Sequence, residues 1–198
     1  PGSVWEAVAE VKGTVLYVHP RLKAGEFIPA ETVLIKIDSS EYQLAISRSA
    51  ANIAKTQADL RELAIAEDNA KKMIAVEKQS LILAKGSIER KRKLLKHNAA
   101  AKDDVDQAEI SFIQHQQNLL KLENDLALIP SKKESLQAVL EVYRSDLEQA
   151  QINLSKTVIR APYDCRPGDV NIKAGQFIKA GQLLFQAHGT DVTEIDVQ

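Results

Sequence analysis

A fifteen-residue segment occurs twice in this 198-residue chain, and the second copy begins 150 residues after the first. Residues 23–37 read KAGEFIPAETVLIKI, and residues 173–187 read KAGQFIKAGQLLFQA, with seven identities at one offset. Each copy places a turn-forming Gly before closely spaced apolar residues, which predicts a tight turn followed by a short strand. We therefore expect the two segments to form one small β-module that a long insertion divides.

The insertion has the composition of long helices. Residues 41–155 are rich in Ala, Leu, Lys, Glu and Gln and contain one Gly and one Pro. Apolar residues recur every seven positions in each half of the insertion, and this period is typical of a left-handed coiled coil. The first ladder is Ile46, Ile53, Leu60, Glu67, Ile74, Leu81, Ile88 and Leu95, and the second is Val105, Phe112, Leu119, Leu126, Lys133, Leu140, Leu147 and Leu154.

The two ladders also predict an antiparallel register. Their members pair so that the two residue numbers total 200, which places the turn near residue 100. Each ladder has one charged member, and these two, Glu67 and Lys133, are expected at the same level as an acid beside a base. The alternative is two surface charges that the coiled coil tolerates independently. Pro130 cannot donate a backbone hydrogen bond, so a kink is expected near that level.

Three segments carry a resemblance to a known family. VKGTVLYVHPRLKAGEFIPAETVLIKIDSSEY and LSKTVIRAPYDCRPGDVNIKAGQFIKAGQLL resemble the two half-modules of the membrane fusion, or periplasmic adaptor, family of bacterial tripartite efflux and secretion systems (HlyD-like). The second segment follows the pattern L-x-x-T-x-I-x-A-P-F-D-G, with Tyr163 and Cys165 as departures. The third segment, RKRKLLKHNAAAKDDVDQA, is similar to the hairpin tip of adaptors that serve RND-type pumps.

The resemblance implies a docking site at this tip. In such adaptors an Arg, a Leu four residues later and a Ser seven beyond that contact an outer-membrane channel. Arg90 and Leu94 match the motif, and Ala101 stands at the Ser position. Ala99, Ala100 and Ala101 are small enough for close approach of the channel's own helical tips, so these five residues are the candidate site.

The expected fold class is α+β, a lipoyl/biotinyl-like β-sandwich split by a long antiparallel coiled-coil hairpin. Residues 4–40 would form the first half of the lipoyl-like domain and residues 156–190 the second half. Residues 41–155 would form the hairpin, with helices at about 41–97 and 102–155. The resemblance also implies that residues 191–198 begin a β-barrel domain and that the chain is a fragment of a longer protein.

The function implied is that of a periplasmic adaptor in a tripartite efflux pump. Such a subunit bridges an inner-membrane transporter, here expected to be of the RND type, to a TolC-like outer-membrane channel, and adaptor copies assemble as a ring that is often hexameric. The native protein would lie in the periplasm and be anchored to the inner membrane by a segment that this chain does not contain. An adaptor of an ABC or MFS export system is the alternative within the family.

Two readings of another class are a lipoyl- or biotinyl-type carrier domain and a purely structural coiled-coil protein. A carrier presents its modified Lys in the turn between its two half-modules, whereas here a hairpin of more than a hundred residues fills that connection. A structural coiled coil leaves the split β-module unexplained. We expect no cofactor, since no Lys is presented in that way.

Catalytic, metal and nucleic-acid functions are not indicated by the residues present. No combination of nucleophile, base and oxyanion donors is recognisable, so the chain is not expected to be an enzyme. The four His residues show no paired ligand spacing, and the single Met offers no soft-metal cluster. The net charge of −1 does not favour nucleic acid. The basic run that starts at Arg90 precedes acids at 103, 104 and 106, which complements the helix dipoles on both sides of the turn.

Overall fold

The computed structural model describes residues 3–190, so the expected start of a β-barrel at residues 191–198 lies outside the described residues. The chain forms two compact units. One contains the described residues up to 52 together with those from 143 onwards, and the other contains residues 53–142. Because the two long helices continue from one unit into the other, each unit is described by itself.

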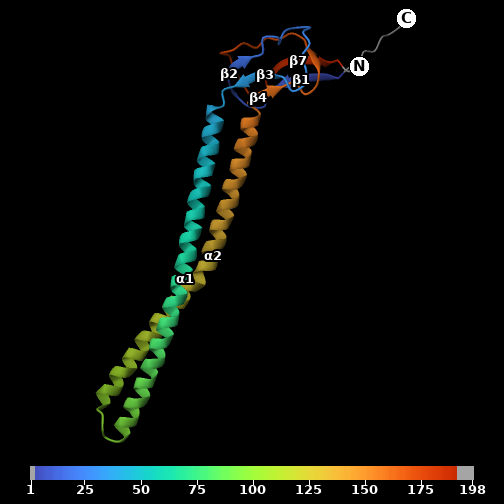
Figure 1. The fold of residues 1–198 in the computed structure, drawn as a ribbon. Helices are drawn as coiled ribbons and strands as arrows, with labels where there is room; N and C mark the ends of the chain where they lie inside the picture. The colour runs from blue at the N-terminus through green and yellow to red at the C-terminus, as the bar shows by residue number, and fades with distance from the viewer. Residues whose placement is uncertain (1–2, 191–198) are drawn as a thin grey trace. The chain divides into compact units, whose positions relative to one another are not determined.

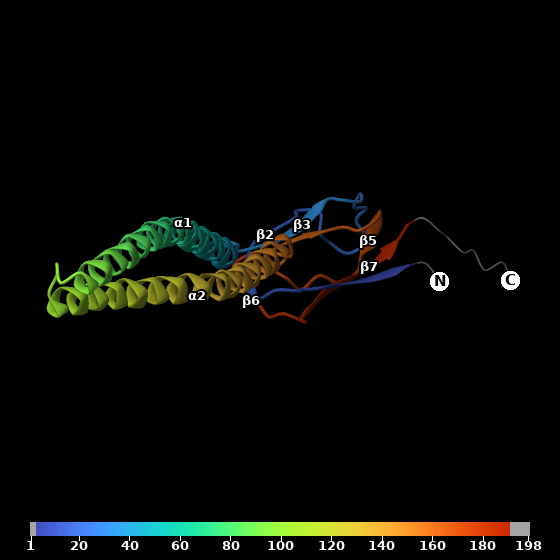
Figure 2. The same ribbon diagram turned by 90° about the horizontal axis from the view of Figure 1, so that it is seen from below.

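The first unit contains two small antiparallel sheets (Figure 1). One sheet has the order β1-β7-β5, and the other has the order β4-β3-β2-β6. In chain order the strands are β1 (Val4–Val8), β2 (Gly13–Val18), β3 (Val33–Ile37), β4 (Val158–Arg160), β5 (Cys165–Pro167), β6 (Phe177–Ile178) and β7 (Leu183–Gly189). The two views agree that β1 and β7 run side by side (Figure 2), as their pairing requires.

Strands from the two halves of the β-module pair with each other. In one sheet β3 of the first copy pairs with β4, which follows the insertion, and in the other sheet β7 of the second copy pairs with β1, which precedes it. The turn of each copy also hydrogen-bonds to the other half of the module. Glu31 donates its backbone N–H to the Ala161 carbonyl at 2.8 Å, and Gly181, at the equivalent position, donates to the Ala9 carbonyl at 2.7 Å. The two segments therefore fold together, as the repeat predicts.

One hydrophobic core joins the two sheets. Its fully buried side chains include Val15, Leu34 and Ile35 from the first segment and Cys165 and Ile178 from the second. Repeat-equivalent positions fill equivalent places, since both Ile28 and Ile178 are 1% exposed or less. Burying side chains from both halves contributes about 1.5–3 kcal/mol for each large aliphatic residue, so neither half has a complete core without the other.

The helices α1 (Ser40–Lys96) and α2 (Lys102–Ser155) are antiparallel neighbours (Figure 1). α1 begins at a polar cap, where the Asp38 carboxylate accepts hydrogen bonds from the backbone N–H and the hydroxyl of Ser40 at 2.9 and 2.7 Å. α2 ends where the Thr157 hydroxyl donates to the Leu154 carbonyl at 2.7 Å. The turn between the helices falls at residues 97–101, as the ladders predict.

In the second unit, residues 53–142, the ladder side chains face the partner helix. Ile74 and Ile88 of α1 and Leu140 of α2 are buried. Salt bridges join Lys78 to Glu123 at 3.0 Å and Arg92 to Glu109 at 2.7 Å, both within one residue of the predicted register. His115, whose Nδ1 lies 2.7 Å from Glu77, contacts α1 well outside that register.

The pairing of Glu67 with Lys133 at the same level of the hairpin remains a prediction. Glu67 forms an ion pair with Lys71, one turn along its own helix, and this hydrogen bond and charge lower the pKa of Glu67. The charge of Lys133 lowers the pKa of Glu67 least of all these causes. α2 continues through Pro130 as one helix.

Candidate functional site: the hairpin tip

The turn between the helices is closed by backbone hydrogen bonds at the end of α1. Asn98 adopts a left-handed conformation with φ of 54°. Its N–H donates to the Leu95 carbonyl at 3.0 Å, and the Ala99 N–H donates to the Leu94 carbonyl at 2.9 Å. These two bonds make a Schellman motif with Asn98 at the C′ position, where an Asn tolerates positive φ better than most residues. The motif satisfies carbonyls that a helix end would otherwise leave unpaired.

The start of α2 is capped from inside the helix. The Asp104 carboxylate accepts a hydrogen bond from the backbone N–H of Ala101 at 3.2 Å. This is the second half of a capping box, in which the third residue of a helix reaches back to the residue before it. The first half is missing because Ala101 has no side-chain oxygen to receive the Asp104 N–H. That N–H turns instead to the Ala101 carbonyl at 3.2 Å.

Two of the bases that precede the turn have partners on α2. Lys91 donates to the Asp104 carbonyl at 3.1 Å, and Arg92 forms its salt bridge with Glu109. Below them Val105 and Ala108 are buried, so the last turns of the hairpin are packed. These contacts support a structural role for Lys91 and Arg92, two residues of the basic run that starts at Arg90.

The five candidate docking residues lie together at this end of the second unit. Leu94 is 48% exposed, although it stands beside a turn whose apolar neighbours are buried. Arg90 is exposed one turn earlier on α1, and its guanidinium folds back over Gly86, where an added Cβ would come within 3.3 Å of its Nη1. Ala99 and Ala101 are exposed and Ala100 is half-buried. The tip thus presents an apolar side chain, a guanidinium with several hydrogen-bond donors and a surface of small residues.

Sequence reasoning missed three residues that shape the tip. Asn98 and Asp104 set the two caps, and Gly86 leaves space for the Arg90 guanidinium. Asn immediately after a helical ladder is a known signal for the C′ position. An Asp three residues after a candidate cap residue is a weaker sign of a capping box, whose usual third residue is Glu or Gln.

In the β-module the described residues give structural roles to the motif of the second segment. The Asp164 carboxylate accepts the backbone N–H of Ala30 at 2.7 Å and so ties the two halves together. Cys165, where the resemblance expects Gly, lies in β5 without a positive φ, and its side chain is buried in the core. Burial, followed by the charge of Asp164, raises the pKa of the Cys165 thiol, which makes it a poor nucleophile.

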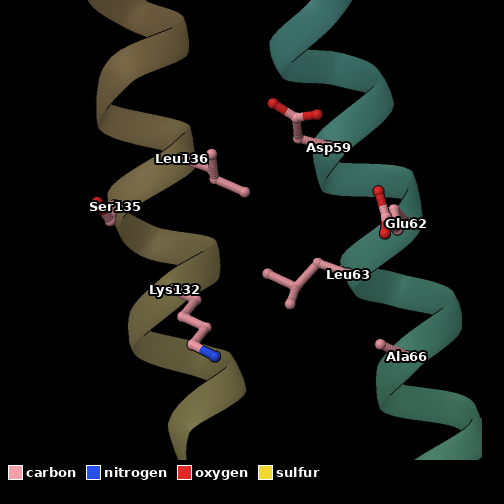
Figure 3. A pocket seen from close by; sticks show the side chains of 7 residues that line it. All are labelled: Asp59, Glu62, Leu63, Ala66, Lys132, Ser135 and Leu136. Carbon is pink, nitrogen blue, oxygen red and sulfur yellow. The ribbon is translucent and has the colours of Figure 1, made fainter.

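The second unit also has a groove between its two helices. Figure 3 shows a groove in the second unit where Leu63 of α1 and Leu136 of α2 point toward each other. The groove is bordered by Asp59 and Glu62 on one helix and by Lys132 and Ser135 on the other. Within residues 3–190, no group of three or more His, Cys, Asp and Glu side chains could hold a metal ion. Neither described helix has a stretch apolar enough to span a bilayer.

No family model matches the chain. A curated relative, the multidrug export protein EmrA of Haemophilus influenzae, is 24% identical over 161 residues; the match covers 79% of this chain and 41% of the relative, so the chain spans less than half of that protein. The membrane fusion protein Spr0693 of Streptococcus pneumoniae R6 matches in structure with a TM-score of 0.52 and 14% identity, covering 96% of this chain and 63% of the other.

The solved periplasmic adaptor protein EmrA is also similar, with a TM-score of 0.49 and 15% identity over 94% of this chain and 72% of the other. At 14% identity the likeness to Spr0693 concerns the fold alone. The curated relative adds a likeness in sequence over most of the chain. The chain is thus similar in sequence to the multidrug export protein EmrA over most of its length and similar in fold to the membrane fusion protein Spr0693.

Proposed function

We propose that this chain is the lipoyl-like domain and α-hairpin of a periplasmic adaptor in a tripartite efflux pump. The observation that carries the proposal is the pairing of strands between the two halves of the β-module, with a coiled-coil hairpin inserted between those halves. The role is mechanical. The adaptor, anchored to the inner membrane, bridges a transporter there to a TolC-like outer-membrane channel, with adaptor copies arranged as a ring in the periplasm.

The hairpin tip is the proposed channel-docking surface. Leu94 supplies an exposed apolar anchor, and Arg90 supplies a planar fork of donors that suits carbonyl and carboxylate acceptors. Because Ala101 replaces the Ser of the related motif, docking rests on packing and on Arg90 rather than on a hydroxyl. The RND type is the first candidate for the transporter, because Arg90 and Leu94 match the tip motif of adaptors for such pumps. An ABC or MFS exporter is the alternative.

The test uses the full-length protein in an efflux-deficient strain. Arg90→Ala combined with Leu94→Ala is expected to abolish drug resistance while expression and helicity stay at wild-type levels. Lys93→Ala is the matched control, since Lys93 is an exposed base on the same turn but lies outside the motif. Resistance at the wild-type level in the double variant would show that the tip is not the docking surface. Co-purification of the wild-type protein with an RND, ABC or MFS permease then identifies the transporter type.

The carrier alternative has its own test. The chain produced in a cell with active lipoyl and biotinyl ligases is expected to have the intact mass of the bare polypeptide. An adduct of either cofactor on a Lys would favour the carrier over the adaptor.

A further inference from the structure

The apolar seam between the two helices of the second unit is interrupted at one level. The two ladders place Glu67 and Lys133 where the rungs on either side hold aliphatic residues. Glu67 forms its ion pair with Lys71 on its own helix and so gives no apolar contact to α2. One rung that would otherwise fill the space between the helices is therefore missing.

The groove between α1 and α2 lies beside this interruption (Figure 3). Its volume of about 440 Å³ falls within the range of roughly 300–1,000 Å³ that is usual for small-molecule sites. Leu63 and Leu136 point toward each other across the groove and are half-buried. Ala66 and Ser135, which also line it, are too small to fill it. A mostly apolar groove between helices is a common place for a small ligand to bind.

Charged side chains make the two ends of the groove different. Figure 3 shows the carboxylates of Asp59 and Glu62 toward one end, and the ammonium of Lys132 toward the other end, near Ala66. The aliphatic stem of Lys132 adds apolar surface to the wall, while its charge can stay in water. The groove, hereafter the carboxylate groove, thus has an apolar middle and an acidic end.

The two carboxylates at the acidic end are free to receive a cation. Glu67 and Asp68, further along α1, each form a salt bridge with a Lys one turn ahead. The positions one turn ahead of Asp59 and Glu62 hold Leu and Ala instead, which cannot form such a pair. Within residues 3–190, neither of these two carboxylates has a salt-bridge partner.

A second groove, nearer the tip, does not have this imbalance of charge. Its volume is about 320 Å³, and its rim carries two bases and two acids, namely Lys85, Arg92, Glu89 and Glu109. The salt bridge of 2.7 Å between Arg92 and Glu109 joins its two walls. Because these charges balance within the protein, the second groove has no preference for a charged ligand of either sign.

We propose that the carboxylate groove binds an amphipathic organic cation, with its apolar body between the two Leu side chains and its positive charge beside Asp59 and Glu62. Such a cation is attracted by two nearby carboxylates and repelled by one ammonium at the far end, whereas an anion of the same shape meets the reverse balance. Water and salt screen these charges, so the preference should weaken as salt is added. The inference goes beyond the mechanical role of the adaptor, since a bridge between two membranes needs no ligand.

Two ions of the same shape and opposite charge test the preference. Tetraphenylphosphonium and tetraphenylborate are titrated separately into the 198-residue chain in a sodium buffer, and binding is measured by isothermal titration calorimetry. The phosphonium is expected to bind at one site and to lose affinity as NaCl is added. Asp59→Asn with Glu62→Gln keeps the shape of both side chains and removes their charge. This variant is expected to bind the phosphonium at least about tenfold more weakly and the borate no more weakly than the wild type.

Filling the groove tests where the cation binds. Ala66→Leu extends a side chain into the carboxylate groove and is expected to abolish binding of the phosphonium. Ala75→Leu is the matched control, because Ala75 is exposed on the same helix and does not line the groove. Its affinity for the phosphonium should equal that of the wild type. Circular dichroism of both variants checks that the helices are intact.

Phosphonium binding that is unchanged in Asp59→Asn with Glu62→Gln, or unchanged in Ala66→Leu, would overturn the inference. A wild-type chain that shows no binding of the phosphonium up to about 1 mM would also do so. These measurements use the purified chain and leave the channel-docking test untouched, since Arg90→Ala with Leu94→Ala is read out by drug resistance. Conversely, resistance that survives those substitutions would count against the docking surface without bearing on the carboxylate groove.

Discussion

Replacement of Glu31 by Gly is expected to stabilise the β-module. Glu31 has a left-handed backbone with φ of 62°, and Gly181, 150 residues later in the repeat, has φ of 81°. Both residues donate their N–H to a carbonyl of the other half of the module. The two turns are therefore equivalent, and only the second has the residue type that this backbone favours.

The magnitude follows from two opposing terms. A side chain in the left-handed region costs roughly 1–2 kcal/mol because Cβ crowds the following carbonyl oxygen. Gly removes this strain but raises the entropy of the unfolded chain, which costs about 0.5–1 kcal/mol. The net gain in the free energy of unfolding is therefore about 0.5–1 kcal/mol. The reciprocal change, Gly181→Ala, should lower it by more than about 1 kcal/mol, since a Cβ there meets nothing within 4 Å and the cost is purely one of backbone.

The single Trp makes the measurement specific to this module. Trp5 packs edge-on against Phe185 with ring centroids 5.4 Å apart. Its fluorescence in a urea titration therefore reports loss of the module's core rather than loss of helix. The expected shift of the midpoint for Glu31→Gly is about 0.3–0.5 M urea. Glu31→Ala is the matched control, because it removes the same side-chain atoms beyond Cβ and keeps the strained backbone.

If Glu31→Gly and Glu31→Ala unfold at the same urea concentration, the strain argument is wrong. The same conclusion would follow if Gly181→Ala were as stable as the wild-type chain. A gain for both Glu31 variants would instead locate the effect in the Glu31 side chain.

Two further changes test the caps. Ala101→Ser supplies the missing oxygen of the capping box and is expected to stabilise the second unit by about 1 kcal/mol, read out as a higher melting temperature by far-UV circular dichroism; Ala101→Val, which has no acceptor, should give no gain. Ser40→Ala should raise the pKa of Asp38, because the Ser40 hydroxyl and then its N–H lower that pKa in the wild type. A depressed folded-state pKa contributes stability above the unfolded pKa that is lost as pH falls, so the variant should lose less stability on acidification; an unchanged Asp38 titration by NMR would exclude this contact.

Much of the architecture was accessible from sequence because it depends on periodicity. Two ladders of period seven predict two helices and their turn, and the observed helices end at Lys96 and begin at Lys102. The repeat identified Gly25 and Gly175 as turn residues, and both have positive φ. These features are local or follow one fixed spacing, so they need no knowledge of three-dimensional packing.

What was missed depends on contacts between distant residues. The strand pairing between the two halves of the β-module cannot be seen in a one-dimensional repeat, since it depends on which strand lies beside which. Glu31 adopts the backbone of a Gly because tertiary hydrogen bonds at Ala161 hold it there. Glu67 has a neighbour on its own helix that the ladder analysis did not consider, namely Lys71. At the tip, Asn98 and Asp104 were overlooked because capping depends on single residues outside the ladder.

The base of the hairpin is fixed by the β-module, and this has a testable consequence for the helices. β3 leads into α1 and α2 leads into β4, and these strands pair, with the Ile37 N–H donating to the Thr157 carbonyl at 2.8 Å. The helices are thus joined at one end by a β-ladder and at the other by a capped turn, so neither can slide along the other. Removing one heptad from each helix, residues 78–84 and 117–123, keeps both ladders in phase and should change the melting temperature little. Removing residues 78–84 alone leaves one ladder Leu of α2 without a partner on α1, and its exposure costs at least about 1.5–3 kcal/mol. The unequal helix lengths would also strain the β3–β4 pairing at one end and the capped turn at the other. Equal stability of the single and double deletions, measured by circular dichroism, would show that the ends do not hold the register.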